Sequence, residues 1–174
     1  MQCVDSPIAV RSAVANNRGE NMPRIVIRDL KELTARVGQE IVVSDWLEIT
    51  QERIDAFADA TGDHQWIHVD PQRAQRESPF GATIAHGFLT MSLLSWFTNE
   101  SIEFGSTKMG VNYGCNRLRF TAPVKSGSRL RTRFVLKACE QIEGGVQLAW
   151  DIRMECEGES KPVLVAEWLT RRYV

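Results

Sequence analysis

The sequence lacks an excess of either charge and lacks a long hydrophobic run. It has 21 lysines and arginines against 22 aspartates and glutamates, a formal net charge of -1, and the two signs are mixed along the chain. Nucleic-acid-binding proteins show a basic patch or stripe, so we expect no nucleic-acid partner. The longest apolar stretches are much shorter than the roughly 20 residues that cross a bilayer, so we expect no membrane partner either.

Cysteine is also scarce. The four cysteines, at positions 3, 115, 139 and 156, form no CxxC pair and no spacing typical of metal ligands. This excludes a disulfide framework and a zinc site of the common kinds, and it is typical of reduced thiols in a cytoplasmic protein.

The length of 174 residues suits one domain that buries its own core. Residues 1–22 keep no regular apolar period, so we expect a disordered or accessory extension there. Residues 23–174 are predicted to form a single domain.

Helical signals come first along the chain. Thr50 is predicted to cap a helix that Gly62 ends, and Asp70-Pro71 to open a short helix that runs to about Glu77. A longer helix is predicted from His86-Gly87 to about residue 99. It is apolar around most of its circumference, which predicts that other elements wrap it on most sides.

Strand signals follow the helices. Four segments alternate apolar and polar residues between turn residues, as strands with one buried face do: residues 111–120, 129–138, 146–155 and 163–171. The order of elements indicates an α+β fold in which an antiparallel sheet surrounds one buried helix.

All three histidines of the chain, His64, His68 and His86, lie in one short window. Asp63 and His68 flank a tight turn and can converge on one water molecule, as a general acid and base pair. The sequence His86-Gly87 begins the long helix, and its free N–H groups can hold negative charge that develops on a carbonyl oxygen. This combination suits either hydration of a conjugated carbonyl or hydrolysis of a thioester.

A metal site is a weaker interpretation. His64 and His68 would lie on one face of a helix, but Gly62 and Pro71 argue against a helix there, and no third ligand is evident. We therefore expect no metal and place His64 at the surface or rim.

Three segments together resemble the MaoC-like family of R-specific enoyl-CoA hydratases. Residues 57–68 (FADATGDHQWIH) are similar to the hydratase-2 motif, and residues 80–87 (FGATIAHG) to the loop that leads into the central helix. Residues 112–124 are similar to the strand and turn after that helix. The resemblance covers about residues 30 to 172 and is nearest to single-domain hydratases of the mycobacterial and actinobacterial kind. It implies a hot-dog fold, a curved antiparallel sheet wrapped around one long helix.

The resemblance also implies roles for residues. Asp63 and His68 match the catalytic pair, Gly87 matches the backbone donor to the thioester carbonyl, and His86 and Asn116 are expected to support the site. The substrate would be an acyl-CoA thioester, no cofactor would be needed, and two copies of the chain would form a homodimer. The chain departs from the family pattern at Gln65-Trp66, where an asparagine-proline pair is usual.

Two rival functions remain open at this point. A hot-dog thioesterase would share the fold, although the spacing of Asp63 and His68 favours addition of water to a carbon–carbon double bond. A non-catalytic subunit of a heteromeric dehydratase would be expected to have lost one of these two residues, and both are present.

Overall fold

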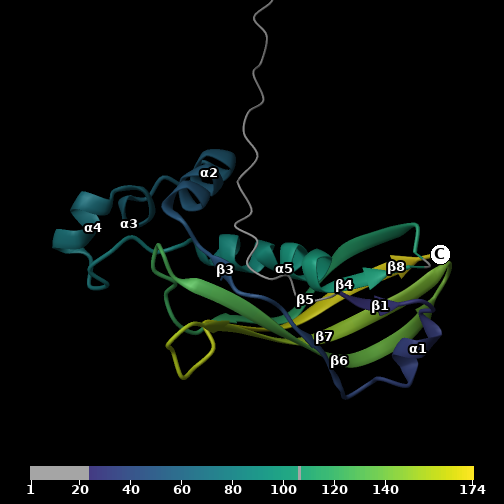
Figure 1. The fold of residues 1–174 in the computed structure, drawn as a ribbon. Coiled ribbons are helices and arrows are strands. Elements are labelled where there is room, and N and C mark those ends of the chain that lie inside the picture. The colour runs from purple at the N-terminus through teal and green to yellow at the C-terminus, as the bar shows by residue number, and fades with distance from the viewer. Residues whose placement is uncertain (1–23, 106) are drawn as a thin grey trace, which may run out of the picture.

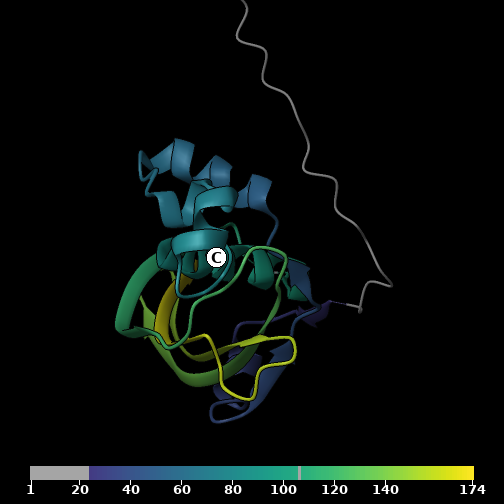
Figure 2. The same ribbon diagram turned by 90° about the vertical axis from the view of Figure 1, so that its left-hand side faces the viewer.

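A long helix lies across the concave face of a curved sheet in the computed structural model, which describes residues 24–105 and 107–174 (Figures 1 and 2). The helix is α5 (Gly87–Ser101). The strands of the sheet are antiparallel, in the order β2-β6-β7-β8-β5, and β3 also pairs with β6. Their bounds are β2 (Glu40–Val43), β3 (Leu47–Glu48), β5 (Met109–Phe120), β6 (Arg129–Ile142), β7 (Gly145–Cys156) and β8 (Leu164–Tyr173). The α+β prediction is confirmed, while the interpretation of residues 1–22 falls outside the described residues.

The core lies between α5 and the sheet. Alternate residues of β6 and β7 are buried, as expected for strands with one face toward a core. The largest fully buried side chains include Phe97 of α5, Phe134 of β6 and Trp150 of β7. The Trp150 indole N–H donates to the Thr170 hydroxyl over 3.0 Å, so the buried ring keeps a hydrogen-bond partner.

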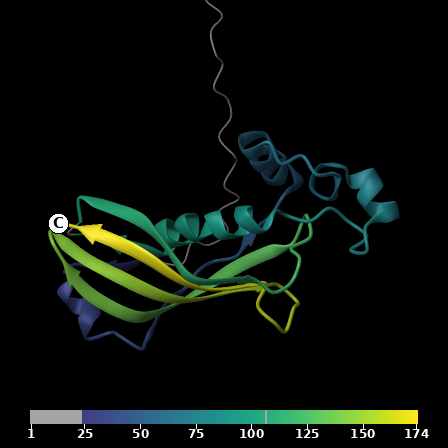
Figure 3. The same ribbon diagram turned by 180° about the vertical axis from the view of Figure 1, so that it is seen from behind.

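Three helices lie together beyond one end of the sheet, whereas the short helix α1 (Lys31–Thr34) and the C-terminus lie at the opposite end (Figures 1 and 3). The three are α2 (Gln51–Thr61), α3 (Trp66–Val69) and α4 (Pro71–Glu77). None of the helices among the described residues is both long and apolar enough to cross a membrane.

The predicted helix signals at this end are confirmed. The Thr50 side chain accepts the Arg53 N–H over 3.3 Å, and Gly62 ends α2 with a left-handed φ of 75°. Asp70 accepts the Arg73 N–H over 2.9 Å and precedes Pro71, the first residue of α4.

The prediction that no helix forms around His68 is wrong, because α3 places it in a single helical turn. This helical turn lies between Gly62 and Pro71, the two residues that argued against a helix here. Gly62 ends α2, and Asp70 leaves helical geometry, with φ -121° and ψ 86°, because the ring of Pro71 disfavours a helical conformation at the preceding residue. His64 precedes α3, so the two histidines do not share a helix face.

The prediction that α5 is wrapped on most sides is confirmed, but one stripe of the helix is open. Phe88 is 67% exposed, and Ser92, Ser95 and Asn99 continue the same exposed stripe. The sequence also gave no indication of a parallel pair formed by β1 (Ile25–Ile27) and β4 (Ile102–Phe104) beside the C-terminal end of α5.

Candidate active site

Asp63 lies in the loop between α2 and α3, directly after the glycine that ends α2. Its side chain is 57% exposed, and one carboxylate oxygen lies 4.0 Å from Nε2 of His86. The loop therefore presents the carboxylate toward two histidines while leaving it open to solvent.

His68 is buried in α3, and one backbone carbonyl determines its tautomer. Nδ1 lies 2.6 Å from the Ile84 carbonyl oxygen. A carbonyl can only accept a hydrogen bond, so Nδ1 carries the proton and Nε2 keeps its lone pair. His68 thus offers a proton acceptor at Nε2.

His86 is more deeply buried, at 4% exposure, and contacts both other residues. Its Nε2–H donates to the backbone carbonyl of Asp63 over 2.9 Å. Its ring stacks on that of His68, with centroids 3.8 Å apart and an interplanar angle of 26°. Phe57 of α2 packs against the same ring at 5.1 Å. His86 therefore connects the Asp63 loop to His68.

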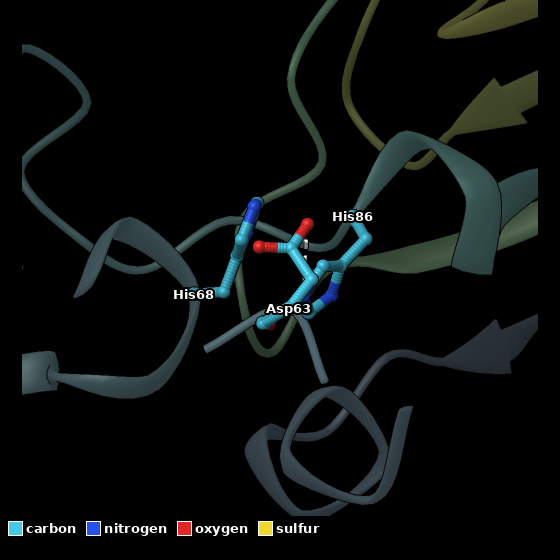
Figure 4. Close-up of side chains that lie close together, drawn as sticks. All are labelled: Asp63, His68 and His86. Carbon is cyan, nitrogen blue, oxygen red and sulfur yellow. Dashed lines mark hydrogen bonds and ion pairs between the residues drawn. The ribbon is translucent and has the colours of Figure 1, made fainter. Parts of the chain in front are cut away.

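The three side chains converge, and the Asp63 carboxylate lies between the two histidines in Figure 4. One polar atom from each of Asp63, His68 and His86 lies within 4.8 Å of the others. A water molecule that bonds to two such atoms spans about 4.6 Å, from two hydrogen bonds of ordinary length at a tetrahedral angle. The spacing suits one water shared by the carboxylate and an imidazole.

Gly87 is the first residue of α5 and lies beside this cluster. The first backbone bond of the helix runs from the Thr90 N–H to the His86 carbonyl, so the N–H groups of residues 87–89 have no partner within the helix. A Cβ atom on Gly87 would lie 2.8 Å from the Phe120 ring, so a larger residue does not fit without movement. Glycine lets the ring approach the helix terminus closely.

A cavity of about 280 Å³ adjoins His68 and the start of α5. Its wall is mostly apolar and includes residues from α5, the end of β5 and the turn that follows β5. Besides His68, the lining consists of Ile84, Ala85, Gly87, Thr90, Phe120, Thr121, Ala122, Pro123, Val124 and Val163. A small apolar group bound in this cavity would therefore lie next to the His68 ring and the N-terminus of α5.

Burial lowers the pKa of His68 below its ordinary value of 6.5, and this is the largest effect on the group. The hydrogen bond to the Ile84 carbonyl opposes it, the neighbouring His86 lowers the pKa further, and Asp63 raises it. The net result keeps His68 neutral near pH 7, with Nε2 able to accept a proton.

Asp63, His68 and His86 are also three potential metal ligands, a combination the sequence did not indicate. The two imidazole planes are nearly parallel, however, and Nε2 of His86 already donates to a carbonyl. Nearly parallel rings direct their lone pairs alongside each other rather than toward one ion at about 2.0–2.1 Å. The geometry favours a shared water over a metal.

The remaining sequence candidates lie apart from this cluster. Asn116 is exposed on β5 and donates to the Glu167 carboxylate over 2.7 Å, so it does not join the histidines. His64 is at the surface, as expected, and pairs with Asp59 at 2.9 Å. Trp66 is the first residue of α3, and the guanidinium carbon of Arg73 lies over its ring, 4.4 Å from the ring centroid. The contribution of Gln51 and Thr83, which bond to the His68 region, was not predicted from the sequence.

Known proteins are similar to this chain over most of its length. The family model described as "MaoC like domain" matches residues 32–152. Nodulation protein N of Rhizobium leguminosarum bv. viciae is 50% identical over 144 residues, covering 81% of this chain and 89% of that protein. The 3-hydroxyacyl-thioester dehydratase Z of Mycobacterium tuberculosis is 48% identical over 141 residues, covering 80% of this chain and 93% of that protein.

The fold agrees with solved structures. The unliganded R-hydratase PhaJ1 of Pseudomonas aeruginosa superposes with a TM-score of 0.63 at 26% identity, covering 79% of this chain and 81% of that chain. The predicted hot-dog fold is confirmed. The chain belongs to the MaoC-like family and is a hydratase or dehydratase of that type.

Proposed function

We propose that the protein adds water to trans-2-enoyl-CoA to give (R)-3-hydroxyacyl-CoA, and catalyses the reverse dehydration. The observation that carries the proposal is the spacing of Asp63 and His68, whose polar atoms lie within 4.8 Å next to the N-terminus of α5. The names of the dehydratase Z and R-hydratase relatives support the thioester substrate and the R configuration.

In the proposed reaction, one water bridges the Asp63 carboxylate and Nε2 of His68. Its oxygen forms a bond to C3 of the enoyl group while the pair removes one proton, and the π electrons move onto the thioester carbonyl as an enolate. The proton then returns to C2 on the same face of the double bond. Water supplies both new substituents, so the reaction as proposed uses no cofactor or metal.

The Gly87 N–H is proposed to stabilise the enolate oxygen. It is free within the helix and lies at the positive end of α5. Losing one such donor typically costs about 2.7–4 kcal/mol of transition-state stabilisation. The acyl chain would enter the apolar cavity beside Thr90 and Phe120.

We also propose that two copies of the chain form a homodimer through β5. Among the described residues β5 pairs with β8 alone, so its other edge is open. That strand exposes Met109, Val111 and Tyr113, and Phe88 of α5 is also exposed. A second copy would cover both the open edge and the apolar side chains. The proposed location is the cytoplasm, which suits the unpaired thiols of Cys115, Cys139 and Cys156.

The test follows crotonyl-CoA and a longer trans-2-enoyl-CoA by absorbance, with a thiol reagent in a parallel cuvette. Loss of the enoyl absorbance without thiol release, followed by chiral analysis that gives the (R)-3-hydroxy product, is the expected result. Release of thiol would instead identify a thioesterase. No reaction with either chain length would favour a non-catalytic subunit.

A further inference from the structure

The side-chain amide of Gln51 connects three elements around His68. Its nitrogen donates to the His68 carbonyl over 2.7 Å and to the Asp55 carboxylate over 2.8 Å. Its oxygen accepts the Thr83 hydroxyl over 2.5 Å. A single amide in the first turn of α2 thus joins α3 to the segment that leads into α5.

The orientation of this amide follows from its partners. A carbonyl oxygen and a carboxylate can only accept, so both must face the amide nitrogen, and the hydroxyl of Thr83 must donate to the amide oxygen. Both donor positions of the nitrogen are then used. Thr83 is 2% exposed, so its hydroxyl depends on this bond rather than on bulk water.

These bonds act on His68 from two sides. The His68 carbonyl belongs to a helix that ends one residue later, so it has no partner within α3, and Gln51 supplies one. Thr83 directly precedes Ile84, whose carbonyl accepts the His68 Nδ1–H. Gln51 therefore holds both the backbone of His68 and the segment that orients its ring.

We propose that Gln51, through Thr83, is a positioning residue that keeps His68 in one tautomer with Nε2 facing Asp63. Gln51 does not line the cavity beside His68, so it would act on the substrate only through His68. Its effect on turnover rests on the proposed function, whereas its effect on the His68 ring does not.

The substitution Gln51→Leu removes all three bonds, and Gln51→Glu keeps an acceptor for Thr83 while losing the donor to the His68 carbonyl. The substitution Thr83→Val removes the hydroxyl with little change of shape, and Thr83→Ser restores it. Gln75→Leu is the matched control, since Gln75 lies beside Gln51 and Thr83 in a second surface cleft but is exposed.

The primary readout is the tautomer and pKa of His68, measured by NMR of the full chain with ¹⁵N-labelled histidine. His86, Asp63 and, through Gln51, Asp55 are the other titratable groups around it. The wild type, Thr83→Ser and Gln75→Leu should show His68 with the proton on Nδ1. Gln51→Leu, Gln51→Glu and Thr83→Val should show a mixture of tautomers and an altered pKa.

The second readout is turnover of crotonyl-CoA. A displacement of about 1 Å at a catalytic group can cost on the order of 100-fold in rate. We expect kcat to fall by up to about that factor in Gln51→Leu and Thr83→Val, with little change in KM. Thr83→Ser should recover the wild-type kcat.

A merely structural role gives a different pattern. If the variants melt earlier but keep the wild-type His68 tautomer and kcat, the proposal is wrong. It is equally wrong if Thr83→Ser behaves like Thr83→Val. Should Gln51→Leu fail to fold, Gln51→Glu and the two Thr83 variants decide. If the wild type hydrates neither crotonyl-CoA nor the longer trans-2-enoyl-CoA, the proposed function fails while the NMR comparison still tests the positioning.

Discussion

The imidazole rings of His68 and His86 stack face to face, 3.8 Å between centroids, although 18 positions separate them in the sequence. His86 is held by the Asp63 carbonyl and His68 by the Ile84 carbonyl, so each ring has a fixed direction. The stack brings together the loop after α2, the short helix α3 and the start of α5. It is the contact through which a change at His86 should reach the acid–base pair.

Substitution of the Asp63 carboxylate should remove activity without affecting the fold. Asp63→Asn keeps the size of the side chain but loses the base, and general acid–base groups typically contribute about 10²–10⁴-fold to the rate. Because the side chain is 57% exposed, the melting temperature should stay unchanged. Enoyl-CoA hydration and circular dichroism test this, with Asp59→Asn as the matched surface control. Near-normal turnover by Asp63→Asn would refute the assignment.

The lowered pKa of His68 should make the folded protein less stable in acid. As the pH falls below 6.5, the unfolded chain binds a proton at this position before the folded chain does. The contribution of His68 to the free energy of unfolding is therefore present above pH 6.5 and is lost as the pH falls through the lower folded pKa.

Urea unfolding between pH 5 and pH 8 tests this prediction by comparing the wild type with His68→Gln. The difference in free energy of unfolding between the two should shrink as the pH falls. His64→Gln is the control of opposite sign, because the hydrogen bond that His64 donates to the Asp59 carboxylate raises the pKa of His64. A pH-independent difference between wild type and His68→Gln would contradict the pKa direction.

Replacing His86 by phenylalanine should change the pH dependence of catalysis. Phenylalanine keeps an aromatic ring on His68 but removes the electrostatic effect of His86 that helps to lower the pKa of His68, so the pKa of His68 should rise toward 6.5. The acid limb of kcat/KM should move to higher pH by the same amount. The rate at its plateau should also fall, since the donor to the Asp63 carbonyl is lost. A pH profile that coincides with that of the wild type would exclude this coupling.

Local signals explain how much of the fold could be predicted. Helix ends depend on one or two residues, so the Thr50 cap, the Gly62 stop and the Asp70-Pro71 start were readable directly. The alternation of apolar residues likewise predicted the four long strands to within a few residues.

Contacts between distant residues could not be read in this way. The bond between Thr83 and Gln51 joins positions 32 residues apart, and a glutamine in a first helical turn carries no pattern that indicates its partner. The same holds for the pairing of Asn116 with Glu167 and for the stack of the two histidines. Asp63 and His68 could be predicted together because only a short loop separates them.

A charge on the open edge of β5 should prevent dimer formation. Val111→Lys places an ammonium on the strand proposed to pair with a second copy, and edge lysines oppose strand pairing. Light scattering after size-exclusion chromatography should show a dimer for the wild type and a monomer for the variant. Val26→Lys, an exposed valine on β1, is the control and should remain dimeric. A wild-type monomer would rule out the proposed homodimer.

The close approach of Phe120 to Gly87 makes Gly87→Ala a sensitive test of the helix N-terminus. The added methyl would lie 2.8 Å from the ring, so either the ring or the start of α5 must move. Inserting a methyl into a tight contact typically costs about 1–3 kcal/mol of stability. Turnover should fall as well, because the Gly87 N–H is proposed to face the thioester carbonyl.

The double variant Gly87→Ala/Phe120→Leu separates steric from chemical effects. Since the Phe120 ring causes the contact, a smaller side chain there should restore most of the stability and part of the turnover, and a double-mutant cycle should show coupling. Gly105→Ala is the control, because a methyl added at Gly105 would lie 3.8 Å from the Ile27 carbonyl oxygen, which is an ordinary contact distance. If the losses of stability and turnover in the two single variants simply add in the double variant, the Phe120 ring does not limit the size of the side chain at position 87. Full activity of Gly87→Ala alone would show that α5 tolerates the methyl without displacing its N–H.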